Sequence, residues 1–166
     1  MKHIFLVVFI CLIFIACGED NEEQNDFLGK VSYNKNDKFI ETQCVISFIN
    51  YYGFEVLVYN TADELREKLV VDSISEIEKG ILKSDITAFY NTRVSHGDVI
   101  QSHYYLDTTA NNYFIIDTYN ETTGDVSGRF QLTMILEVWY DLYNEPESDT
   151  LRFTEGQFET RINYLK

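Results

Sequence analysis

The residues best suited to ligand chemistry gather around the single tryptophan, Trp139. Glu137 and Asp141 lie two positions before and after it, and Tyr143 follows. In an extended strand these side chains share one face, because successive side chains alternate between faces. An indole beside carboxylates can stack on a sugar or a peptide while the acids accept hydrogen bonds. The sequence therefore predicts a ligand-contact site at Glu137, Trp139, Asp141 and Tyr143. Coverage of Trp139 by another segment is the alternative that stays open.

Metal chemistry has weak support. His96 and His103 lie seven positions apart with no cysteine nearby, which does not make a zinc site. Calcium is less strongly excluded, because two polar stretches carry oxygen ligands without EF-hand spacing. These ligands are Asp107, Asn111 and Asn112 in the first stretch, and Asn120, Glu121 and Asp125 in the second. No cofactor is predicted, and calcium is the one ion kept open.

Catalytic signatures are lacking in the sequence. There is no G-x-S-x-G motif, Ser95 beside His96 is simple adjacency, and the eight glycines form no phosphate loop. We therefore do not predict an enzyme. The formal net charge of −14 also repels phosphate backbones, so no nucleic-acid partner is expected.

The N-terminus has the features of a cleaved leader. Lys2 and His3 precede an uninterrupted apolar run over 4–16, which is too short to span a bilayer and has the length of a signal-peptide core. Ala16 then precedes Cys17, as in bacterial lipoprotein signals, where the cysteine is lipidated and becomes the first residue. The sequence predicts a signal peptide over 1–16 and acylation, such as palmitate, on Cys17. The predicted location is the outer membrane, on its cell-surface or periplasmic side.

The mature chain is predicted to be a tether followed by one domain. Five of the nine residues over 18–26 are acidic and none is basic, so 17–26 should be a flexible tether. Residues 27–166 suit a single domain with its own core. Cys44 is then the sole remaining thiol outside the tether, in an apolar strand-like run, and we expect it to be buried and inert.

The element that organises the domain is the run over 126–140. One register of this run is apolar or small and the other is mostly polar, which is typical of a half-buried strand. Its length predicts a bend or bulge, which we place near Gly128. Further strands are expected over 28–33, 43–50, 52–59, 68–73, 87–93, 100–106, 113–119, 151–154 and 157–164. The segment over 61–80 is ambiguous, because a capping-box pattern competes with the strand we favour.

These elements predict an all-β fold of eight to ten strands with little helix. Turns every 8 to 12 residues favour an antiparallel β-sandwich, with a small antiparallel β-barrel as the alternative.

Two motifs in the C-terminal half carry a resemblance. Ser127-Gly128-Arg129-Phe130 has the form S-G-x-F, and Thr154-Glu155-Gly156-Gln157-Phe158 has the form T-x-G-x-F. Over roughly 100–165 the chain resembles a family of small uncharacterised Bacteroidota lipoproteins. The resemblance transfers no catalytic residue. Physically, Gly128 and Gly156 would permit close backbone approach, with Phe130 and Phe158 filling the core beside them.

The function expected from these features is a membrane-anchored binding module of the cell envelope. Its partners would be the membrane, through Cys17, and a glycan, a peptide or an envelope protein. The alternative is a structural or accessory subunit of an envelope complex, and an enzyme is the least favoured class.

Overall fold

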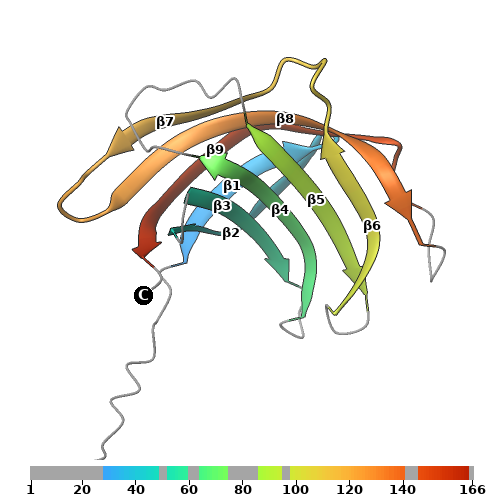
Figure 1. Ribbon diagram of the computed structural model, residues 1–166, viewed down its shortest axis with the longest axis horizontal. Helices are drawn as coiled ribbons and strands as arrows, with labels where there is room; N and C mark the ends of the chain where they lie inside the picture. The colour runs from blue at the N-terminus through green and yellow to red at the C-terminus, as the bar shows by residue number, and fades with distance from the viewer. Residues whose placement is uncertain are drawn as a thin grey trace, which may run out of the picture.

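Nine β-strands form the described part of the chain in a computed structural model, which describes residues 28–48, 52–59, 64–74, 86–94, 98–140 and 146–164. They are β1 (Gly29–Lys35), β2 (Lys38–Phe48), β3 (Tyr52–Tyr59), β4 (Leu65–Ile74), β5 (Thr87–Val94), β6 (Val99–Leu106), β7 (Tyr113–Tyr119), β8 (Asp125–Trp139) and β9 (Thr150–Tyr164) (Figure 1). The predicted all-β class with eight to ten strands is confirmed. The ambiguous segment contains β4, so its strand interpretation is also confirmed, while the leader and tether lie outside the described residues.

The strands belong to one hydrogen-bonded sheet that curves around the core (Figure 1). Pairing runs from β8 through β9, β1, β2, β3, β4, β5 and β6, and β6 then pairs with the C-terminal part of β8. β7 lies outside this circuit and pairs with the N-terminal part of β8. All pairings are antiparallel except a short parallel contact between the ends of β2 and β9. The long strands β8 and β9 therefore connect both ends of the sheet.

The core follows the alternation read from the sequence. In β8 the apolar register from Val126 to Met134 is buried, and the intervening side chains are partly or fully exposed. Aromatic rings make up the centre of the core, where large side chains suit a curved sheet that must be filled from within. The largest fully buried aromatic side chains are Tyr33, Phe54, Tyr90, Tyr104, Phe114, Phe130 and Phe153.

Residues inserted between paired positions bend the strands at several points. Such β-bulges leave one strand with an extra residue and redirect its side chain. Three of the extra residues are Asp117 in β7, Glu155 in β9 and Glu137 in β8, and further register shifts interrupt the pairing of β3 with β4 and of β5 with β6. The irregularity beside Gly128 thus lies in the partner strand β7, and the bulge within β8 comes nine residues later.

Within the described ranges, no helix has the length and apolarity needed to cross a membrane.

Candidate functional site

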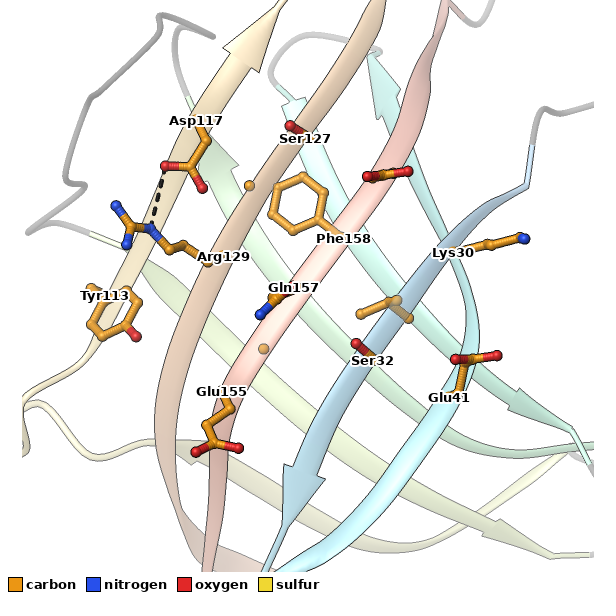
Figure 2. Close-up of a pocket in the computed structure, with 14 residues that line it drawn as sticks. Lys30, Ser32, Glu41, Tyr113, Asp117, Ser127, Arg129, Glu155, Gln157 and Phe158 are labelled. Carbon is orange, nitrogen blue, oxygen red and sulfur yellow. Dashed lines mark ion pairs between the residues drawn. The ribbon is translucent and has the colours of Figure 1, made fainter.

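A hollow of about 670 Å³ opens on the outer face of the sheet, over β7, β8, β9 and β1 (Figure 2). Side chains that point away from the core supply most of its lining, because each strand sends alternate residues outward. The polar residues lining the hollow are Lys30, Ser32, Glu41, Tyr113, Asp117, Ser127, Arg129, Glu155, Gln157 and Glu159. Val31, Gly128, Gly156 and Phe158 complete it.

One cross-strand row forms the middle of the hollow. Arg129 of β8 pairs with Gln157 of β9, Gln157 pairs with Ser32 of β1, and Ser32 pairs with Glu41 of β2. Directly paired residues on one face lie about 5 Å apart at Cβ. The row therefore carries an arginine, a glutamine, a serine and a glutamate on four adjacent strands, and the Arg129 guanidinium points away from Gln157 toward Asp117 on β7 (Figure 2).

The bulge in β7 brings Asp117 into this hollow. Ile116 pairs with Gly128 and Thr118 pairs with Ser127, so Asp117 is the extra residue between them. Its carboxylate Oδ1 lies 3.3 Å from Nε of Arg129 (Figure 2). Asp117 and Thr118 are consecutive, yet both lie beside outward-facing residues of β8, namely Arg129 and Ser127. Strict alternation would put one of the two on the inner face, so the bulge is what allows this arrangement. The extra residue of β7 thus forms an ion pair at the edge of the hollow.

The bulge in β9 brings in a second carboxylate, that of Glu155. The register shifts at this point against both neighbouring strands, and Glu155 has φ of 55°. A non-glycine residue in this left-handed region carries backbone strain of order 1–3 kcal/mol. Its carboxylate accepts a hydrogen bond from Nδ2 of Asn34 at 2.7 Å. The chain thus maintains a strained residue at the border of the hollow.

The hollow is net acidic. Its charged side chains are the cations Lys30 and Arg129 and the carboxylates Glu41, Asp117, Glu155 and Glu159. The ion pair with Asp117 partly neutralises Arg129. Lys30 pairs directly with Glu159 across β1 and β9, and this pairing also sets opposite charges together. The remaining character of the surface is negative with many hydrogen-bonding groups.

Residues of both sequence motifs meet at this hollow, which was not among the sites predicted from the sequence. Ser127 and Gly128 come from the first motif, and Gly156 and Phe158 from the second. Asp117 and Glu155 were missed as site residues because each is an extra residue at a register shift, whereas Arg129 lies in the polar register of the run over 126–140.

The predicted site around Trp139 is only partly described. Trp139 is 37% exposed and Glu137 is exposed, whereas Asp141 and Tyr143 lie outside the described residues. Because Glu137 is an extra residue, the alternation shifts by one position after it. Trp139 therefore pairs with the buried Ser102 and does not lie on the outward face predicted from the sequence. Glu137 itself lies 3.4 Å from Nε2 of His103. The structure thus places the two described residues of this site at one end of β8, away from the residues that line the hollow.

A second polar cluster, around Lys35, lies inside the curved sheet. Lys35 is 4% exposed and its Nζ donates to both carboxylate oxygens of Glu67 at 2.9 Å and to the hydroxyl of Tyr90 at 3.0 Å. Glu147 lies 3.0 Å from the same nitrogen. Each hydrogen of the ammonium therefore has an acceptor, as a buried charge requires. The strand predicted here ended at residue 33, whereas Lys35 is the last residue of β1 and its side chain points inward.

Burial shifts the ionisation of several groups in the core. Desolvation raises the pKa of Tyr33 and of Tyr90 well above the usual tyrosine range, and the carboxylate of Glu67 adds to both shifts. Desolvation also raises the pKa of Cys44 to about 12. Cys44 is fully buried, as predicted, and its thiol stays protonated and unreactive at neutral pH.

The two polar stretches considered for calcium are organised by their own turns. Asp107 accepts hydrogen bonds from the backbone and hydroxyl of Thr109, and these bonds lower the pKa of its carboxyl group. Asn120 accepts from the backbone of Thr122 and Thr123. Among the residues that the structure describes, no group of three or more His, Cys, Asp or Glu side chains could hold a metal ion. His96 lies outside those residues.

Comparison of the chain with family models, with curated proteins and with solved structures found no match. The class defined by the observations above is an antiparallel all-β domain with a polar, bulge-lined hollow on its outer face.

Proposed function

We propose that this chain is a binding module of the bacterial cell envelope that takes a polar ligand in the outer hollow. The observation that carries this proposal is the convergence of two β-bulges on one surface. Asp117 and Glu155 are each an extra residue in their strand, and each adds a carboxylate to the border of the same hollow. Bulges redirect side chains next to functional sites, and a strained residue is kept where the surroundings determine it.

The chemistry of the hollow fits reversible recognition. Donors and acceptors from several strands are presented on a rigid sheet, which positions them more firmly than loops would. Arg129 and Gln157 offer planar groups that form paired hydrogen bonds, and Ser32 and Ser127 offer hydroxyls. These groups favour a glycan or a polar peptide as the ligand.

The cellular setting of the proposal rests on the sequence of the leader. Lipid chains on Cys17 would hold the domain at the outer membrane, since each buried methylene contributes about 0.8 kcal/mol to membrane binding. The Cys17→Ser variant should move from the membrane fraction to the soluble fraction. Retention of this variant on membranes would contradict the anchor. Cleavage of the domain by protease added to intact cells would place it on the cell surface.

The binding proposal is tested with a library of glycans and peptides presented to the full chain. Arg129→Gln should weaken the binding of any ligand found, because it removes the positive charge at the β8 end of the row. Arg161→Gln is the matched control, since Arg161 is also exposed on the sheet and forms an ion pair with an aspartate, Asp125, at 2.8 Å. Equal binding by both variants and the unchanged chain would contradict the hollow as the site.

A further inference from the structure

We infer that the ligand of the outer hollow is a neutral oligosaccharide, held by the row of Arg129, Gln157, Ser32 and Glu41. This inference rests on the proposed function and narrows it to one class of ligand.

The charge of the hollow argues against anionic ligands. Four carboxylates border it against two cations, and Asp117 engages one of those cations, Arg129. The whole chain adds a negative field, with a formal net charge of −14. A phosphorylated, sulfated or uronic-acid ligand would be repelled over a distance of about 8–10 Å at physiological salt.

The small apolar content of the hollow argues against a lipid or a hydrophobic peptide anchor. Among its lining residues, Val31 and Phe158 belong to the core and are 1% and 2% exposed. Tyr113 is the one aromatic lining residue whose side chain is only half-buried. Anchors of hydrophobic ligands need pockets lined mostly by apolar side chains, and this surface offers few.

The hydrogen-bonding groups match the hydroxyls of a sugar. Guanidinium, amide and carboxylate groups are planar and each can contact two neighbouring atoms at once, as vicinal hydroxyls require. The backbone positions of the row follow one another at the strand spacing of about 4.8 Å, and the Arg129 guanidinium extends the row over β7, so these groups can engage successive hydroxyls along a chain of sugar units. Hydroxyls both donate and accept, which suits a row that contains donors as well as acceptors.

Tyr113 supplies a surface on which a sugar ring can stack. It lies on β7 beside Arg129, at one border of the hollow (Figure 2). Aromatic rings combine an apolar face with a polar hydroxyl, so they bind the C–H face of a sugar while the polar row holds its edge. The row and the ring together form an open site across the strands.

The acidic border would also attract a cationic peptide, and the two ligand classes differ in how they respond to salt. Attraction between exposed charges falls steeply with ionic strength, whereas hydrogen bonds and stacking to a neutral sugar change little. Salt dependence therefore separates the two classes at the same site.

The test is calorimetric titration of the full chain with named probes. The neutral probes are cellohexaose, xylohexaose, mannohexaose and chitohexaose, and the charged probes are trigalacturonate and hexalysine. We expect at least one neutral probe to bind with little salt dependence and trigalacturonate not to bind. Gln157→Ala and Arg129→Gln should each raise Kd by about tenfold or more, and Arg161→Gln should leave it unchanged.

Three outcomes would overturn the inference. Failure of all four neutral probes to bind would do so, as would neutral binding that Gln157→Ala does not weaken. Binding of hexalysine alone, lost at high salt and weakened by Glu155→Gln, would replace the sugar with a cationic peptide while leaving the hollow as a binding site. The proposed function is contradicted by a different result, namely that Arg129→Gln weakens the binding of no ligand in the wider library.

Discussion

The ring of Phe130 lies directly over Gly156, its paired residue on the neighbouring strand. A Cβ atom added to Gly156 would come within 2.7 Å of three ring carbons of Phe130. Two residues further along the same pair of strands the arrangement is reversed: here Phe158 of β9 covers Gly128 of β8. Each glycine thus makes room for the aromatic ring on the other strand. The two motifs recognised in the sequence are therefore two halves of one packing unit.

The first prediction concerns these glycines. Gly156→Ala should lower the free energy of unfolding by about 1–3 kcal/mol, because overpacking forces the buried ring of Phe130 to move. Gly128→Ala should cost more, since its added Cβ would also lie 2.1 Å from the backbone oxygen of Ile115, which cannot rotate away. Urea denaturation of both variants gives these values.

Gly53→Ala provides the control for a strand glycine. A Cβ at Gly53 would meet nothing within 4 Å, so the substitution should be neutral or slightly stabilising. If all three variants lose the same stability, steric exclusion by the rings is the wrong explanation.

The sequence predicted the strands well because alternation is a local signal. β3 and β7 begin and end where the pattern indicated, and β8 differs by one residue at each end. The two runs over 151–154 and 157–164 are instead one strand, β9. The break expected between them is the bulge at Glu155, where backbone strain replaces a turn. Alternation is interrupted there, although the hydrogen-bonded strand continues.

The second prediction concerns the buried Lys35. Lys35→Met should destabilise the fold by about 3 kcal/mol, because it leaves the partly buried Glu67 close to Glu147 without their shared cation. Glu147→Gln should cost about 1 kcal/mol or less, since Glu147 is 41% exposed. The double variant with Lys35→Met and Glu67→Met should recover part of the loss. Denaturant titration that finds no recovery would contradict charge pairing as the reason.

The third prediction is a loss of stability at alkaline pH. The pKa values of Tyr33, Tyr90 and Cys44 are raised in the folded protein by desolvation. Above pH 9 to 10 the unfolded chain releases these protons while the folded chain keeps them, so stability falls as pH rises. Below the ordinary pKa of each group its contribution is complete and constant. Urea midpoints measured from about pH 8 to about pH 12 should therefore decline.

Cys44→Ala tests the part of this decline that belongs to the thiol. In this variant the loss of stability between pH 9.0 and about 12 should be smaller than in the unchanged chain. An identical slope in both proteins would assign the whole decline to other groups.

The carboxylates Asp117 and Glu155 at the border of the candidate site could not be predicted from the sequence because they lie at bulges. Asp117, Glu137 and Glu155 are all extra residues, and each carboxylate has a polar partner: Arg129, His103 and Asn34, respectively. A shift of one residue changes the face on which every later side chain lies. Alternation alone therefore assigned Trp139 to the outward register and missed the hollow.

The fourth prediction separates strain from binding at Glu155. Glu155→Gly should maintain or raise stability, because glycine adopts φ near 55° without the steric cost of a side chain. The same variant should bind the ligand of the hollow more weakly, since it removes a carboxylate from its border. Thermal unfolding and ligand titration measure the two effects. A variant that loses both stability and binding would show that the residue serves the fold.

The fifth prediction concerns Trp139, the only tryptophan in the chain. It is 37% exposed at the end of β8, so its fluorescence emission should lie between that of a buried and that of a fully hydrated indole. Acrylamide is the suitable quencher, because iodide is repelled by Glu137 and by the net charge of −14. Quenching should be weaker in the folded chain than in urea. Trp139→Ala should cost about 2 kcal/mol, less than the 3–5 kcal/mol of a fully buried tryptophan. If this substitution leaves stability unchanged and abolishes ligand binding, the end of β8 is the ligand site and the hollow is not.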